Sequence, residues 1–176
     1  FPGMFGTIDR AQSGYFKGKP LDSIHPDLGA GDIIDTQRWL RAFVEADDVQ
    51  YQLRGPCDLI AIKNDGFHLI GDFKTADPAK HPPEDYAFQL NAYCMGSTQS
   101  GDKADSWAVL YYQPDSYSPL DTQEIRHGLF GSVSVDIRQH EPDSIVEKLK
   151  EISAVIKRDE VPDSSPDCNF CRYNLA

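Results

Sequence analysis

Two β-rich segments joined by a four-residue turn constrain the fold of this chain more than any other feature. The segments are residues 57–62 and 67–74, and Lys63-Asn64-Asp65-Gly66 joins them. Asn, Asp and Gly favour the backbone of a tight hairpin turn, so two adjacent antiparallel strands are predicted. Side chains alternate along a strand, which places Asp72 and Lys74 side by side on one face.

Asp58 lies in the first of these two strands, on the same predicted face as Ile60 and Ile62. Hairpin pairing can bring it beside Asp72, so two carboxylates and an ammonium group would meet at one strand end, outside the core. Such a group can hold Mg²⁺ through oxygen ligands, while the cation polarises a phosphodiester and the lysine orients water or stabilises developing charge. The alternative is an exposed Asp–Lys pair on a sheet face, which contributes little energy.

A helix predicted over residues 84–96 carries a polar residue among apolar ones. Gln89 shares a stripe with Tyr86, Leu90 and Tyr93. A buried glutamine needs hydrogen-bond partners, and Gln89 and Tyr93 are one turn apart, so both could reach the Asp72 end of the strands. Alternatively, Tyr93 belongs to the core and Gln89 satisfies main-chain groups.

The remaining segments complete an α/β pattern. We expect a helix over 4–17, a turn-rich crossing over 19–36, strands over 38–44, 49–54, 107–112 and 131–138, and a last helix over 142–156. The predicted order is α-β-β-β-α-β, followed by a further strand, a helix and a tail. We expect one domain over residues 1–176, with a cysteine-containing tail over 162–176, as part of a longer product.

The charge balance restricts how the chain could meet DNA. Lys and Arg number 17 and Asp and Glu 28, a net charge of -11, which argues against broad attraction to phosphate. Any contact with DNA must therefore be local. Basic side chains that could contribute if the fold gathers them are Arg38, Arg41, Lys80, His81 and Arg172.

The chain has four cysteines, which are too few for a secreted disulfide scaffold. We therefore expect a reducing, cytoplasmic setting, and no apolar run is long enough for a membrane span. Only Cys168 and Cys171 have the spacing of metal ligands, and they supply two of the four ligands that zinc or an iron–sulfur cluster requires. Cys57 and Cys94 are expected to be buried free thiols.

Three segments, in this order and at these separations, resemble the RecB-like branch of the PD-(D/E)XK nuclease superfamily. They are Arg54-Gly55-Pro56-Cys57-Asp58, Ile70-Gly71-Asp72-Phe73-Lys74-Thr75 and Gln89-Leu90-Asn91-Ala92-Tyr93. The closing Pro166-Asp167-Cys168-Asn169-Phe170-Cys171-Arg172-Tyr173 also resembles the tail of that branch. The resemblance implies a restriction-endonuclease-like core, a mixed central sheet flanked by helices, and DNA cleavage that depends on Mg²⁺ or Mn²⁺.

The resemblance also implies roles for single residues. Asp58 and Asp72 would bind the cation, together with the main-chain carbonyl of Phe73. Lys74 would be the catalytic lysine. Further site residues implied at matching positions are Gln89 and Tyr93, as active-site support or DNA contacts, with Asp9 on the first helix and Thr75 after the lysine as additional candidates.

The expected function is a DNA nuclease, most simply an exonuclease, in recombination, repair or phage DNA processing. A helicase or recombination protein is the expected partner. The main alternative is a non-catalytic DNA-binding or scaffold module of a helicase–nuclease assembly. Two others are an iron–sulfur or zinc protein and an acidic interaction domain; with two tail cysteines, we do not expect an iron–sulfur cluster.

Overall fold

The fold is built on one mixed sheet of five strands. The structure, a computed structural model, describes residues 14–114, 131–158 and 160. The strands are β1 (Gly31–Ala46), β2 (Val49–Lys63), β3 (His68–Lys74), β4 (Ala104–Pro114) and β5 (Gly131–Gln139), and they lie in that order in the sheet. β3 and β4 are parallel, and the other neighbouring pairs are antiparallel. The predicted mixed central sheet is confirmed.

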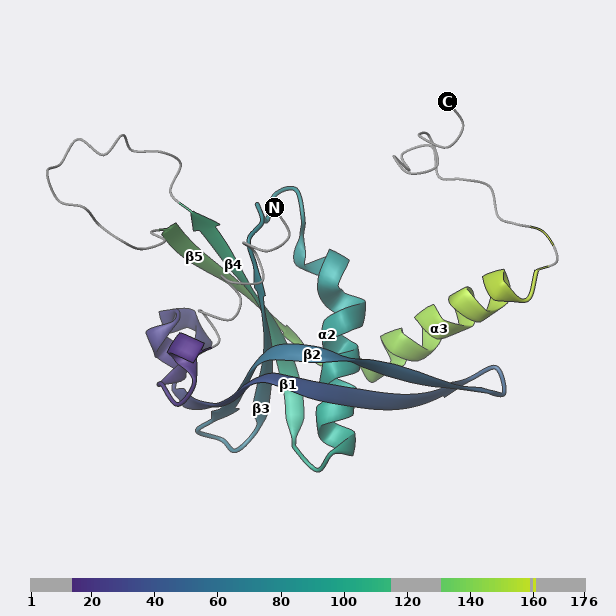
Figure 1. The fold of residues 1–176 in the computed structure, drawn as a ribbon, viewed down its shortest axis with the longest axis horizontal. Helices are drawn as coiled ribbons and strands as arrows, with labels where there is room; N and C mark the ends of the chain where they lie inside the picture. The colour runs from purple at the N-terminus through teal and green to yellow at the C-terminus, as the bar shows by residue number, and fades with distance from the viewer. Residues whose placement is uncertain (1–13, 115–130, 159, 161–176) are drawn as a thin grey trace, which may run out of the picture.

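Helices flank the sheet, as predicted (Figure 1). The parallel pair β3–β4 requires a crossover connection, which α2 (Ala87–Gln99) supplies, preceded by a 3-10 turn, η3 (Pro83–Tyr86). Two more 3-10 turns, η1 (Leu21–Ser23) and η2 (Pro26–Leu28), come before β1, and α3 (Pro142–Ile156) follows β5. No helix in residues 14–114 or 131–158 combines the length and apolar character needed to cross a membrane.

Apolar side chains form a separate core on each face of the sheet. On the α2 face, Leu90 and Cys94 pack against strand residues such as Ile60, Ile70 and Val109. On the opposite face, the cluster consists of Leu21, Leu28, Ile33, Leu59, Ala61, Leu69, Phe73, Ala108 and Leu110. The strands β3 and β4 contribute to both clusters, which explains why they read as nearly continuous apolar runs.

β1 and β2 extend beyond the other strands as a two-stranded arm that runs toward α3 (Figure 1). We call residues 37–58 of this hairpin the ribbon. Its turn is formed by Asp47 and Asp48, both with positive φ, 52° and 60°, as a tight two-residue hairpin requires. One face of the ribbon is buried: Ala42 and Val44 pack in a third cluster with Ile145 of α3.

The structure corrects two expectations about this region. Residues 31–36, expected in a turn-rich crossing, form the first part of β1, and the short strands expected over 49–54 and 57–62 are one strand, β2. Pro56 does not interrupt β2 because β3 pairs with β2 only over Leu59 to Ile62, which leaves one side of the strand open at Pro56. From β1 onward, the order of strands and α-helices is β-β-β-α-β-β-α, as predicted for the segments after the first helix.

Other predicted elements agree with the structure. The turn before β3 forms as expected, with the Gly66 N–H donating to the Lys63 carbonyl at 2.9 Å. The strands expected over 107–112 and 131–138 and the helix over 142–156 correspond to β4, β5 and α3. The helix expected over 84–96 begins as η3 and continues as α2. Of the helix expected over 4–17, only residues 14–16 are helical within the described part; residues 4–13 lie outside it.

Candidate active site

The candidate site lies where β2 and β3 separate. The two strands pair from Ile62 and His68 as far as Leu59 and Gly71, and Asp58 and Asp72 are the next residues along each strand. The Phe73 N–H donates to Asp58 Oδ2 at 3.0 Å. The Asp58 carboxylate thus accepts a main-chain hydrogen bond at the point where the strand ladder ends, and a buried N–H group requires such an acceptor. The separation of the strands therefore directs Asp58 toward β3.

The alternation expected around Asp58 does not hold. Cys57 and Ile60 both belong to the core cluster on the α2 face, whereas Leu59 and Ala61 belong to the opposite cluster. Asp58 lies at this change of face, so alternation along β2 does not determine the direction of its side chain. The contact that brings it to β3 is the hydrogen bond from the Phe73 N–H, which periodicity alone could not predict.

Asp72 and Lys74 form an ion pair on β3, as their spacing predicted. Lys74 Nζ lies 2.5 Å from Asp72 Oδ2. Asp72 is only 2% exposed. The expectation that it lies outside the core was therefore wrong. A buried carboxylate is costly unless it is paired and hydrogen-bonded, and Lys74 supplies the charge. The contact between Lys74 Nζ and Asp72 Oδ2 therefore places the ammonium charge directly on the buried carboxylate.

The electrostatics of the site keep Lys74 charged. Burial disfavours the ammonium form of this half-buried side chain, but the carboxylate of Asp72, which also hydrogen-bonds Nζ, and that of Asp58 outweigh burial. The net effect raises the pKa of Lys74 above its ordinary value. Lys74 is therefore a cation and a hydrogen-bond donor at neutral pH.

Gln89 and Tyr93 reach the site from α2. Gln89 Nε2 lies 3.4 Å from Asp72 Oδ1 and 3.2 Å from the Tyr93 hydroxyl. Burial raises the pKa of Tyr93, and the nearby charge of Asp72 acts in the same direction, so the phenol remains neutral. The close packing depends on Gly55, because a Cβ there would lie 2.6 Å from the Tyr93 hydroxyl oxygen. The helix stripe predicted from the sequence therefore does meet Asp72.

Gln37 contacts the site, and the sequence analysis missed it. Its Nε2 donates to Asp58 Oδ1 at 2.9 Å. The residue has a φ of +56°, in the left-handed region that few non-glycine residues adopt. Glutamine carries no strong preference for this conformation, so no signal in the sequence marks the position.

Two further candidates from the sequence are Thr75 and Asp9. Thr75 follows β3, is exposed, and lines a separate cavity of about 260 Å³ with Asp77 and Tyr112. Asp9 lies outside the described residues. Phe73 contributes its main-chain N–H to Asp58, while its side chain packs in the core opposite α2.

The donor atoms suit a hard divalent cation. Asp58 and Asp72 present carboxylate oxygens on neighbouring strands, and oxygen is the ligand atom that Mg²⁺ prefers. Among the described residues no three His, Cys, Asp or Glu side chains gather in a group suited to a metal. Mg²⁺ typically uses one or two carboxylates and keeps water or phosphate oxygens as its other ligands, so two carboxylates satisfy its requirement.

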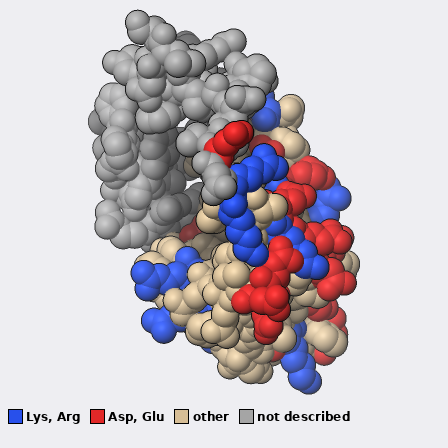
Figure 2. Space-filling model, turned by 90° about the vertical axis from the view of Figure 1, so that its right-hand side faces the viewer, with Lys and Arg blue, Asp and Glu red and all other residues tan. Residues whose placement is uncertain are grey.

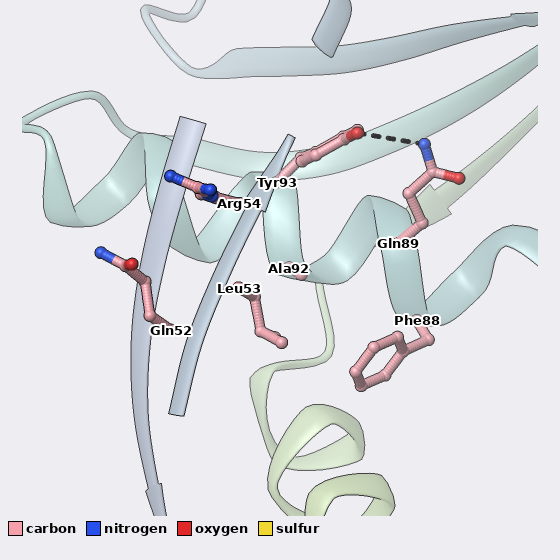
Figure 3. Close-up of a pocket in the computed structure, with 7 residues that line it drawn as sticks. All are labelled: Gln52, Leu53, Arg54, Phe88, Gln89, Ala92 and Tyr93. Carbon is pink, nitrogen blue, oxygen red and sulfur yellow. Dashed lines mark hydrogen bonds between the residues drawn. The ribbon is translucent and has the colours of Figure 1, made fainter. Parts of the chain in front are cut away.

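A cavity of about 370 Å³ lies beside these residues, between β2 and α2 (Figure 3). Leu53, Phe88 and Ala92 provide its apolar lining, and Gln89 and Tyr93 join it to the candidate site. Arg54 and Gln52 also line it. The candidate site is therefore continuous with a space in which part of a substrate could lie.

The two cysteines of the described part belong to the core on the α2 face of the sheet. Cys57 and Cys94 are buried free thiols, as predicted. Burial is the main cause that raises the pKa of both thiols well above the ordinary value, which makes them unreactive at neutral pH. Cys168 and Cys171 lie outside the described residues.

Comparison with known proteins identifies the family. No curated protein matches the chain. Among solved structures, the crystal structure of SSO0001 matches with 15% sequence identity and a TM-score of 0.49, and the match covers 80% of this chain and 58% of that chain. A family model described as the PD-(D/E)XK nuclease superfamily matches residues 25–175, a range that includes strands β1 to β5, α2 and α3. The chain therefore belongs to the PD-(D/E)XK nuclease superfamily, and its mixed sheet with flanking helices is a restriction-endonuclease-like fold.

Proposed function

We propose that this chain hydrolyses phosphodiester bonds of DNA with the help of Mg²⁺ or Mn²⁺. The observation that carries the proposal is the meeting of Asp58, Asp72 and Lys74 at the separation of β2 and β3. A phosphodiester carries a negative charge, and its hydrolysis develops more charge on the phosphate oxygens. A cation held by two carboxylates, with a lysine ammonium beside them, suits that change.

We assign the cation to Asp58, Asp72 and the main-chain carbonyl of Phe73. When bound, Mg²⁺ or Mn²⁺ would polarise the phosphate and activate water for attack. Contacts with neighbouring groups hold both carboxylates, which supports this assignment. Gln37 and the Phe73 N–H hold Asp58, and Gln89 and Lys74 hold Asp72. This second set of contacts limits the reorganisation that binding a cation requires.

Lys74 is proposed to donate hydrogen bonds and not to accept a proton. Its raised pKa keeps it charged at neutral pH, so it cannot serve as a general base there. Its ammonium can orient the attacking water or stabilise the negative charge that develops on the phosphate. The neutral Tyr93 hydroxyl can donate a hydrogen bond to a phosphate oxygen, while Gln89 positions Asp72.

The finer assignment to the RecB-like branch, and to an exonuclease, is also a proposal. It is supported by the order and spacing of the three motif segments. An exonuclease of this type would act in recombination, repair or phage DNA processing in the cytoplasm, alongside a helicase or recombination partner. The net charge of -11 implies that DNA affinity falls steeply with salt and depends on the cation or on such a partner.

Degradation of end-labelled single- and double-stranded DNA tests the proposal. Wild type and Asp72→Asn should be compared in Mg²⁺, Mn²⁺ and EDTA. We expect cleavage only with a cation and only by wild type, and the product ladder would give the polarity. DNA binding without turnover under every condition would instead support the non-catalytic module.

A further inference from the structure

The outer face of the ribbon, opposite α2 and α3, exposes large side chains. Its inner face is covered by these helices, because Leu40, Ala42 and Val44 belong to the buried clusters. The intervening residues Trp39 and Phe43 are 65% and 51% exposed. Exposed aromatic side chains of this size, placed together on one face, usually mark a binding surface.

Cross-strand pairing arranges this face in successive levels. Opposite residues are Phe43 with Gln52, Arg41 with Arg54, and Trp39 with Pro56. Each level is about 7 Å from the next along the strands. An aromatic level, a level of two arginines and a second aromatic level therefore alternate, and Glu45, opposite Gln50, ends the series toward the hairpin turn.

The arginine level lacks a neutralising partner. Neither the Arg41 nor the Arg54 guanidinium forms an ion pair or hydrogen bond with any described residue. Like charges directly opposite each other destabilise a strand pair, so an anion placed between them would relieve repulsion. This cationic level is unusual in a chain with a net charge of -11. Figure 2 shows the uneven distribution of charge, with acidic side chains crowded over one part of the face in view.

The ribbon is held in place by α2. The side-chain amide of Gln99 accepts a hydrogen bond from the Phe43 N–H at 2.8 Å and donates to the Phe43 carbonyl at 2.9 Å. Gly96 allows close approach, because a Cβ there would lie 2.9 Å from the main chain of Arg41. The outer face is therefore a preorganised surface that loses little conformational entropy on binding.

We propose that the outer face of the ribbon binds a single-stranded segment of DNA and leads it to the candidate active site. Bases would stack on Trp39 and Phe43, and phosphates would lie on Arg41 and Arg54. Aromatic side chains alternating with cations are the arrangement that binds single strands without sequence preference, because every base has a face that can stack.

The inference rests on the proposed nuclease function for its direction along the ribbon. Trp39 is two residues from Gln37, whose amide holds Asp58. Arg54 is four residues from Asp58, a distance of about 13 Å along β2. A strand that follows the levels from Phe43 to Trp39 would thus arrive at the proposed catalytic carboxylates.

Tryptophan fluorescence provides a direct test. The chain has two tryptophans, and Trp107 is only 4% exposed and donates its ring N–H to Asn91. Titration of the whole chain with a thymidine 12-mer in EDTA should quench Trp39, because a stacked base quenches indole emission. Trp39→Phe should remove the quenching. Unchanged emission at saturation of an independently measured binding curve would overturn the proposal.

Affinity measured by anisotropy of a labelled 12-mer supplies the second test. We expect Trp39→Ala to weaken binding about tenfold. The control Phe67→Ala, which removes a 43% exposed aromatic residue next to the β2–β3 turn, should leave binding unchanged. Arg41→Gln with Arg54→Gln should reduce the slope of log affinity against log salt by about 1.4, since each phosphate contact contributes about 0.7 for single strands.

Three further results would overturn the proposal. They are equal affinities for Trp39→Ala and Phe67→Ala, equal competition by duplex DNA of the same length, and a dimer in sedimentation that Trp39→Ala dissociates. The last would show that the face binds a second copy of the chain. Because these measurements are made in EDTA, they do not depend on cleavage. Quenching and tight binding without cleavage in Mg²⁺ would contradict only the proposal that the chain is a nuclease. Cleavage by Trp39→Ala with an unchanged KM would contradict only the proposal that the ribbon binds DNA.

Discussion

Removing one member of the Asp72–Lys74 pair should cost more stability than removing the other. Asp72 is 2% exposed, whereas the Lys74 side chain is 25% exposed. In Lys74→Met, a buried carboxylate loses its cation, and breaking a buried pair in this way costs about 3 kcal/mol. In Asp72→Asn, the remaining ammonium can turn toward water, and the amide keeps the contact with Gln89, so the cost should be about 1 kcal/mol.

Urea denaturation at pH 7 in EDTA measures this difference. With a slope near ~2 kcal/mol/M, the midpoint should fall by about 1.5 M in Lys74→Met and by about 0.5 M in Asp72→Asn. The cost of Lys74→Met should shrink in acid, where the carboxyl can take up a proton and lose its charge. Equal losses in the two variants, or a larger loss in Asp72→Asn, would refute the reasoning that burial of the carboxylate determines the cost.

Three further predictions concern other contacts. Gln37→Gly and Gln37→Ala should each reduce cleavage about tenfold, as expected for the loss of one hydrogen bond to a charged group. The Gly variant should be the more stable of the two, because the backbone φ at this position is +56°. Cleavage at the wild-type rate would contradict a positioning role for Gln37. Gly55→Ala should destabilise the fold by about 2 kcal/mol through contact with the Tyr93 hydroxyl, and Tyr93→Phe in the same chain should recover part of that loss. Because the folded chain raises the pKa of Cys57 and Cys94, their protons bind more tightly in the folded state, so stability should fall above about pH 9 by about 1.4 kcal/mol per pH unit for each thiol. In thermal melts between pH 8 and 10, the melting temperature of Cys94→Ala should fall less steeply with pH than that of wild type. An equally steep fall would show that the Cys94 thiol does not ionise on unfolding.

The parts of the site set by local periodicity could be predicted from the sequence. The side chains of Asp72 and Lys74 lie two residues apart on one strand, so their pairing follows from the pleat. Gln89 and Tyr93 lie one helical turn apart, and their contact follows from the helix. The turn before β3 was predictable because Gly66 supplies the positive φ, +83°, that the turn needs.

The parts that depend on pairing between distant segments could not be predicted. The ladder between β1 and β2 shifts register near Ile33 and Asp35, and Gln37 adopts a left-handed backbone, neither of which leaves a periodic signal. The contacts of Asp58 with Gln37 and with the Phe73 N–H also join segments that are distant in the sequence. The burial of Asp72 also escaped prediction, since it requires α2 to cover the end of β3, and no local pattern specifies that contact.

Binding of Mn²⁺ tests the central claim that Asp58 and Asp72 form one cation site. Electron paramagnetic resonance of free Mn²⁺ would measure affinity for wild type, Asp58→Asn, Asp72→Asn and the control Asp35→Asn, which alters a carboxylate paired with Lys17 instead. We expect one site whose affinity falls at least about tenfold in each of the first two variants and is unchanged in the control. Wild-type affinity in Asp58→Asn and Asp72→Asn would contradict the account.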